Sequence, residues 1–105
     1  MELPVQITYR GLDSTEALSD LIRKESDKLD KFFDRIVACR VLVEREQHHL
    51  RSGTPFRVRL DLTVPGAELD VDAAHKDAAL TVREAFRRAR RRLQDSVRAK
   101  IKNKP

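Results

Sequence analysis

One stretch of the sequence alternates apolar and polar side chains so regularly that it constrains the fold more than any other feature. From Phe56 to Val64 every second residue is apolar, and residues 69–73 resume the alternation after the tight-turn dipeptide Pro65-Gly66. A strand with this pattern has one apolar face and one polar face. The stretch therefore predicts a β-hairpin whose apolar face must be covered by other elements.

Two further segments alternate in the same way and predict two more strands. The first covers residues 3–9 and ends at Gly11, and the second covers residues 37–43. The polar segment from Gln47 to Thr54 follows the second of these strands and is typical of a hairpin loop. We thus expect a sheet of four strands.

Two segments have apolar residues at helical spacing. The first runs from a cap at Ser14 or Thr15 to about Asp34, and the second from about Asp77 to Lys102. The apolar stripe of the second consists of Val82, Phe86, Ala89, Leu93, Val97 and Ile101. The order β-α-β-β-β-α predicts an α+β, two-layer sandwich with both helices on one face of the sheet. Because a helix joins the first two strands, they are expected to be parallel if adjacent.

Positive charge is concentrated at one end of the sequence. The chain has 105 residues and a net charge of +5, yet residues 83–104 contain ten Lys and Arg against only Glu84 and Asp95. The remainder is therefore slightly acidic. A polarised charge distribution of this kind favours polyanionic partners, with nucleic acid as the first candidate and an anionic membrane surface as the second.

The arginines of the last helix have a preferred side. At about 100° per residue, one flank and the outer face carry Arg83, Arg87, Arg90, Arg91 and Arg98, whereas Arg88 and Arg92 lie on the opposite flank. The planar guanidinium fork suits phosphate oxygens, so we predict RNA binding here. Membrane insertion is not expected, because the apolar stripe is needed to cover the sheet.

The predicted outer face of the sheet carries polar and charged residues and no aromatic side chain. Base stacking on an exposed sheet, as in RRM domains, is therefore not expected, since Tyr9, Phe32, Phe33, Phe56 and Phe86 all fall on predicted core faces. Recognition is expected to run mainly through phosphate, sugar and shape, with little base reading.

The sequence offers no recognisable catalytic or metal-binding motif. His48 and His49 are adjacent in the predicted loop and are interpreted as solvated, and the single cysteine, Cys39, as a buried apolar side chain. Asp70 and Asp72 share a strand face and are expected to pair with Arg57 or Arg59. We expect no enzyme activity, cofactor, metal or small-molecule substrate. With one cysteine and no apolar leader or membrane span, a cytoplasmic location is expected.

Several segments together resemble a known family. They are Gln6-Ile7-Thr8, Thr15-x-Ala17-Leu18, Lys31-x-Phe33-Asp34-Arg35-Ile36 and the strand-turn-strand segment from Leu62 to Leu69. In these segments the chain is similar to the short ribosome hibernation-promoting factors and ribosome-associated inhibitors, also called sigma-54 modulation proteins. The similarity extends over nearly the whole sequence and includes the family's order of elements, a fold related in shape to double-stranded-RNA-binding domains.

The resemblance implies a non-enzymatic factor that binds the small ribosomal subunit in the mRNA and tRNA channel and inhibits translation in stationary or stressed cells. The positions that match rRNA-contacting basic residues are Lys28, Lys31, Arg88 and Arg91. It also implies that residues 1–105 are a single ribosome-binding domain without a C-terminal dimerisation domain, and we expect a monomer.

The chain departs from the family pattern at Ala79 and Arg83, where Tyr and Asp are usual, and at Glu25, where a basic residue is common. Two other functions stay open at this point. One is a regulatory module that docks on an acidic protein, and the other is a generic binder of double-stranded RNA.

Overall fold

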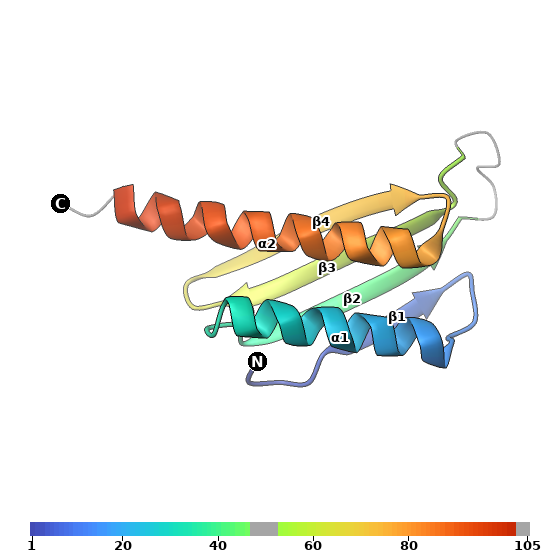
Figure 1. Cartoon of the computed structure of the whole chain (residues 1–105), viewed down its shortest axis with the longest axis horizontal. Helices are drawn as coiled ribbons and strands as arrows, with labels where there is room; N and C mark the ends of the chain where they lie inside the picture. Colours follow the sequence, from blue (N-terminus) through green and yellow to red (C-terminus); the bar gives the residue numbers. More distant parts are fainter. Residues whose placement is uncertain (47–52, 103–105) are drawn as a thin grey trace.

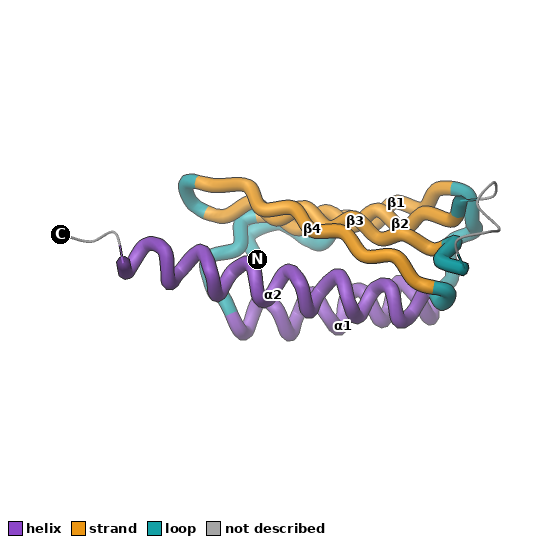
Figure 2. Tube along the Cα trace, turned by 90° about the horizontal axis from the view of Figure 1, so that it is seen from above, coloured by secondary structure: helices purple, strands orange, loops and turns teal. Residues whose placement is uncertain are grey.

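The computed structural model describes the backbone of residues 1–46 and 53–102, with side chains up to residue 98. The elements in this part of the chain are β1 (Gln6–Arg10), α1 (Glu16–Phe32), β2 (Ala38–Arg45), β3 (Phe56–Val64), β4 (Ala67–His75) and α2 (Ala78–Lys102). The strands form one sheet in the order β1-β2-β3-β4, and both helices lie on one face of it (Figures 1 and 2). The predicted α+β sandwich is confirmed.

The directions of the strands follow from how they are connected. β1 and β2 are joined through α1 and are parallel, with Ile7 opposite Val41. β2, β3 and β4 are antiparallel neighbours, and Leu60 in β3 lies opposite both Val41 and Val71. This register keeps the apolar residues of the strands on the side of the helices. The parallel pairing that we expected for the first two strands is confirmed.

A single aliphatic core lies between the sheet and the two helices. Ile22 of α1, Leu60 of β3 and Val82 of α2 are completely buried at its centre. The hydroxyls of Tyr9 and Ser19, 2.7 Å apart, share a hydrogen bond that ties β1 to α1. Cys39 is buried among these side chains, as predicted.

Each helix begins at a polar cap. Of the two predicted caps for α1, Thr15 is the one used, because its hydroxyl accepts a hydrogen bond of 3.1 Å from the N–H of Leu18. Asp77 precedes α2, and its carboxylate accepts a hydrogen bond of 2.9 Å from the N–H of Leu80. At the N-terminus of each helix, the cap thus accepts a hydrogen bond from a backbone N–H that has no partner inside the helix.

Several predicted boundaries are wrong by two or three residues, and one of them is the end of β2, which lies at Arg45 and not at residue 43. β1 begins at Gln6 and not at Leu3, since Pro4 has no N–H to donate to a strand pair; the Leu3 side chain is exposed. α1 ends at Phe32 and not at Asp34, because Phe33 has extended backbone angles. The predicted hairpin loop from Gln47 to Thr54, with its two histidines, lies almost wholly outside the described residues.

Two side chains assigned to the core from the sequence are exposed. Val97 is 40% exposed and belongs to the C-terminal part of α2, the end at which the helix continues past the sheet (Figure 1). The expectation that the whole apolar stripe of α2 covers the sheet is therefore wrong at Val97, and the side chain of Ile101 is outside the described part. Phe32 is 36% exposed at the end of α1, between the two helices.

Candidate nucleic-acid interface

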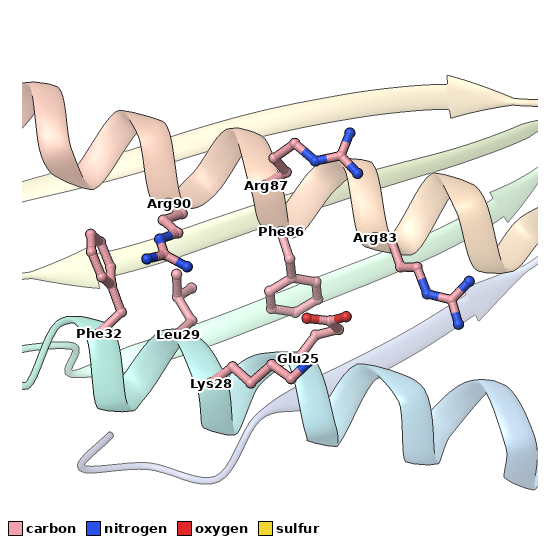
Figure 3. Close-up of a pocket in the computed structure, with 8 residues that line it drawn as sticks. All are labelled: Glu25, Lys28, Leu29, Phe32, Arg83, Phe86, Arg87 and Arg90. Atoms are coloured by element: carbon pink, nitrogen blue, oxygen red, sulfur yellow. The ribbon is translucent and has the colours of Figure 1, made fainter.

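A groove runs along the outer side of the molecule where α1 and α2 lie next to each other (Figure 3). It has a volume of about 280 Å³. Its described lining consists of Glu25, Lys28, Leu29 and Phe32 from α1, and Arg83, Phe86, Arg87 and Arg90 from α2. The arrangement places basic side chains from two distant parts of the sequence around one hollow.

The helical repeat explains why these residues meet. Arg83, Arg87 and Arg90 are spaced by four and three residues, so they lie along one side of α2. That side faces α1. Beneath them Leu29 and Phe86, each 4% exposed, hold the two helices together as an apolar floor. The groove is thus a consequence of the same packing that builds the core.

Among the described residues, the cations of the groove have no acidic partner at short range. Lys28, Arg83, Arg87 and Arg90 are exposed, and none of them forms an ion pair within the part of the chain that the structure describes. Glu25 is the one acid among the described lining residues. Four positive charges against one negative charge leave a local excess that a polyanion can neutralise.

Arg90 has an additional contact. Its guanidinium carbon lies 4.3 Å from the centroid of the Phe32 ring, within the distance of about 6 Å expected for a cation–π interaction. Figure 3 shows the two side chains facing each other at the end of the groove, Phe32 from α1 and Arg90 from α2.

The other predicted site residues lie outside this groove. Arg91 is exposed beside Arg92 and Asp95, toward β4. Arg98 lies next to Phe33 and Val97, where α2 passes the end of α1. Lys31 is exposed in the last turn of α1. The predicted set is therefore split between the groove and its surroundings.

Arg88 is engaged by the protein itself. Its guanidinium donates a hydrogen bond of 2.9 Å to the Glu84 carboxylate and another to the backbone carbonyl of Asp72 in the edge strand β4. A ring nitrogen of His75 lies 2.8 Å from the same carboxylate. The hydrogen bond with His75, together with Arg88, holds the pKa of Glu84 below its usual value. Arg88 would have to leave these partners before it could bind a phosphate.

The outer face of the sheet neutralises its own charge. Arg57 pairs with Asp72 at 2.8 Å, and Arg59 with Asp70 at 3.2 Å, which confirms the pairing predicted for these strands. A third arginine of this face, Arg40, lies 3.8 Å from Glu68. The hydrogen bond from Arg57 lowers the pKa of the Asp72 carboxyl. Cations on this face are already paired, whereas those of the groove are not.

Sequence reasoning missed Phe32 and Glu25 as parts of the groove. At about 100° per residue, Phe32 points only about 40° from Lys28 but about 60° from the buried Leu29. These angles could have indicated from the sequence that Phe32 lies at the edge of the apolar stripe, next to the exposed Lys28. Glu25 interrupts that stripe in the sequence, and the structure places it on the groove wall.

The described residues provide little for catalysis or metal binding. No three or more His, Cys, Asp or Glu side chains among them are grouped so that they could hold a metal ion. Burial raises the pKa of the Cys39 thiol from 9.0 to about 12, so it is a poor nucleophile. In the same part of the chain, neither helix is long and apolar enough to cross a membrane.

The chain is similar in sequence and in fold to proteins named for the ribosome. It is 32% identical over 75 residues to a "ribosome hibernation promoting factor" of Azotobacter vinelandii, an alignment that covers 71% of this chain. The chain covers 64% of that relative, less than two thirds of its length.

Two solved structures have the same fold. A "ribosomal subunit interface protein" of Coxiella burnetii has a TM-score of 0.75 at 20% identity, covering 88% of this chain and 94% of the other. The N-terminal domain of Thermus thermophilus Protein Y has a TM-score of 0.71 at 21% identity, covering 90% and 98%. The model of the family "Sigma 54 modulation protein / S30EA ribosomal protein" matches residues 5–101. The chain belongs to this family.

Proposed function

We propose that the protein is a ribosome-associated hibernation factor that binds rRNA of the small subunit in the mRNA and tRNA channel and inhibits translation. The observation that carries the proposal is the contrast between the two faces of the molecule. The groove face has unpaired cations, and the sheet face has arginines that are paired with Asp and Glu. Membership of the family supplies the ribosome as the partner.

In this proposal the groove residues Lys28, Arg83, Arg87 and Arg90 bind phosphates directly. Arg91 and Arg98 extend the contact along α2, and Lys31 extends it along α1. An exposed arginine with no acidic neighbour gives up no ion pair when it binds a phosphate. Arg88 is a weaker candidate on this ground, although it matches a basic position of the family.

The proposal requires neither catalysis nor a cofactor, and it places the protein in the cytoplasm, where it acts as one monomeric ribosome-binding domain.

Two triple variants test which face of the protein binds rRNA. Both remove three positive charges. The groove variant is R83Q/R87Q/R90Q, and the sheet variant is R40Q/R57Q/R59Q.

The experiment is co-sedimentation of each purified protein with purified small ribosomal subunits in a sucrose gradient. Wild type and the sheet variant should migrate with the subunits, and the groove variant should stay at the top of the gradient. Binding of the groove variant at wild-type level would refute the assignment.

A further comparison separates the two other functions. If free RNA duplex displaces the protein from the subunits as well as rRNA does, it is a generic duplex binder. If its complexes in cell extract survive RNase, the partner is an acidic protein.

A further inference from the structure

The contact between Phe32 and Arg90 is not explained by the packing of the core. Leu29, one turn earlier in α1, is 4% exposed, whereas Phe32 is 36% exposed. Arg90 is also exposed, and its guanidinium covers the ring of Phe32 at 4.3 Å. Two flat π systems are thus held together at the surface, in a groove lined by basic side chains (Figure 3).

Flat side chains of this kind bind unpaired bases. Bases stack on aromatic rings and on guanidinium planes, and this stacking tolerates any base because each has a π face. The groove volume of about 280 Å³ is slightly below the usual range of ligand sites, about 300–1,000 Å³. A hollow of this size favours a single small planar group, such as one base, over a larger ligand.

We propose that Phe32 and Arg90 form a stacking site for one unpaired RNA base, while Lys28, Arg83 and Arg87 bind the phosphates on either side. This inference rests on the proposed function and makes it more specific. It adds a base contact to the expectation that recognition runs mainly through phosphate, sugar and shape, which placed Phe32 in the core. Single-stranded rRNA, and not helical rRNA, is then the preferred ligand of the groove.

The stacking site can be tested with a probe that differs only in its bases. The probe is a single-stranded RNA of about ten nucleotides, a length within the usual site sizes of single-strand binders. It is compared with an abasic oligomer that has the same ribose-phosphate backbone and the same charge. Phosphate contacts are equal for the two oligomers, so any preference reports contact with bases.

Wild type should bind the base-bearing oligomer about five- to hundredfold more tightly than the abasic one. Phe32→Leu keeps an apolar side chain but removes the ring, and Arg90→Lys keeps the charge but removes the plane. Both variants should lose most of the preference. Arg92→Lys, on the opposite flank of α2, is the matched control and should keep it.

Equal binding of the two oligomers by wild type, including no measurable binding of either, would overturn the stacking site. So would a preference that Phe32→Leu retains in full.

The same proteins are also sedimented with small ribosomal subunits. If wild type prefers bases but does not bind subunits, the proposed function fails and the stacking site stands. If wild type binds subunits but shows no base preference, the stacking site fails and the proposed function stands.

Discussion

The salt dependence of rRNA binding gives a quantitative test of which cations contact phosphate. The structure leaves seven of the predicted cations on the helices without an acidic partner among the described residues; they are Lys28, Lys31, Arg83, Arg87, Arg90, Arg91 and Arg98. Each phosphate neutralised contributes about −0.9 to the slope of log Kobs against log salt concentration. Seven contacts give a slope of about −6.3, so affinity should fall roughly 6,000-fold between about 50 and 200 mM salt.

The groove variant removes three of these seven cations. Its slope should be about −3.6, and its affinity should fall only about 150-fold over the same range of salt. The sheet variant loses the same number of charges, but its arginines are paired with Glu68, Asp72 and Asp70. Its slope should equal that of wild type. The exposed ion pairs of the sheet contribute about 0–1 kcal/mol each to stability, so the sheet variant should fold.

Fluorescence anisotropy with a labelled rRNA fragment, measured at several salt concentrations, gives the three slopes. Circular dichroism of each variant checks that it is folded. Equal slopes for wild type and the groove variant would refute the assignment of phosphate contacts to this side of α2. An equally reduced slope for the sheet variant would mean that only net charge matters.

Three further predictions concern the scaffold. Gly11 has φ 77° and lies against a backbone carbonyl at the end of β2, whereas Gly66 has φ 79° and open space around it. In urea titrations, Gly66→Ala should lower the free energy of unfolding by about 1–2 kcal/mol. Gly11→Ala should lower it by distinctly more, because the new methyl group would also collide with the backbone carbonyl of Arg45. Equal losses for the two variants would contradict this contact. The lowered pKa of Asp72, caused by its hydrogen bond with Arg57, stabilises the fold above its ordinary pKa of 3.8, and this stabilisation is lost as the pH falls below that value. The stability gap between wild type and Asp72→Asn should therefore shrink from pH 7 to about pH 3, and a constant gap would argue against the ion pair. The Cys39 thiol, with its pKa raised to about 12 by burial, should react with a thiol reagent only after unfolding, so rapid labelling of the native protein would disprove its burial.

The fold could be predicted because several local signals agree. Alternation from Phe56 to Val64 fixes a one-sided strand, and the apolar stripe from Val82 to Leu93 fixes the side of α2 that faces it. The predicted burial of side chains is wrong near the end of a helix, where the core no longer covers it. Val97 has the right spacing but is 40% exposed near the C-terminal end of α2, and spacing along one helix does not indicate where the layer that it covers ends.

The candidate site could be predicted only in part. The positions of Arg83, Arg87 and Arg90 on one side of α2 follow from the helical repeat alone. They lie around the same groove as Lys28 because α1 packs against α2. A pattern within one segment of the sequence does not predict how two helices pack. The ion pair of Arg88 with Glu84, by contrast, has the i,i+4 spacing that could have predicted it.

The proposed function requires the helix face, and not the sheet face, to lie against rRNA, and site-directed cleavage of rRNA distinguishes the two faces. Because Cys39 is buried, an introduced surface cysteine can carry an iron chelate that generates hydroxyl radicals. Gln94→Cys places the chelate on the exposed side of α2, and Thr8→Cys places it on the outer face of β1. With each labelled protein bound to small subunits, we expect rRNA cleavage from position 94 and none from position 8. Cleavage from position 8 alone, or equal cleavage from both, would contradict the account.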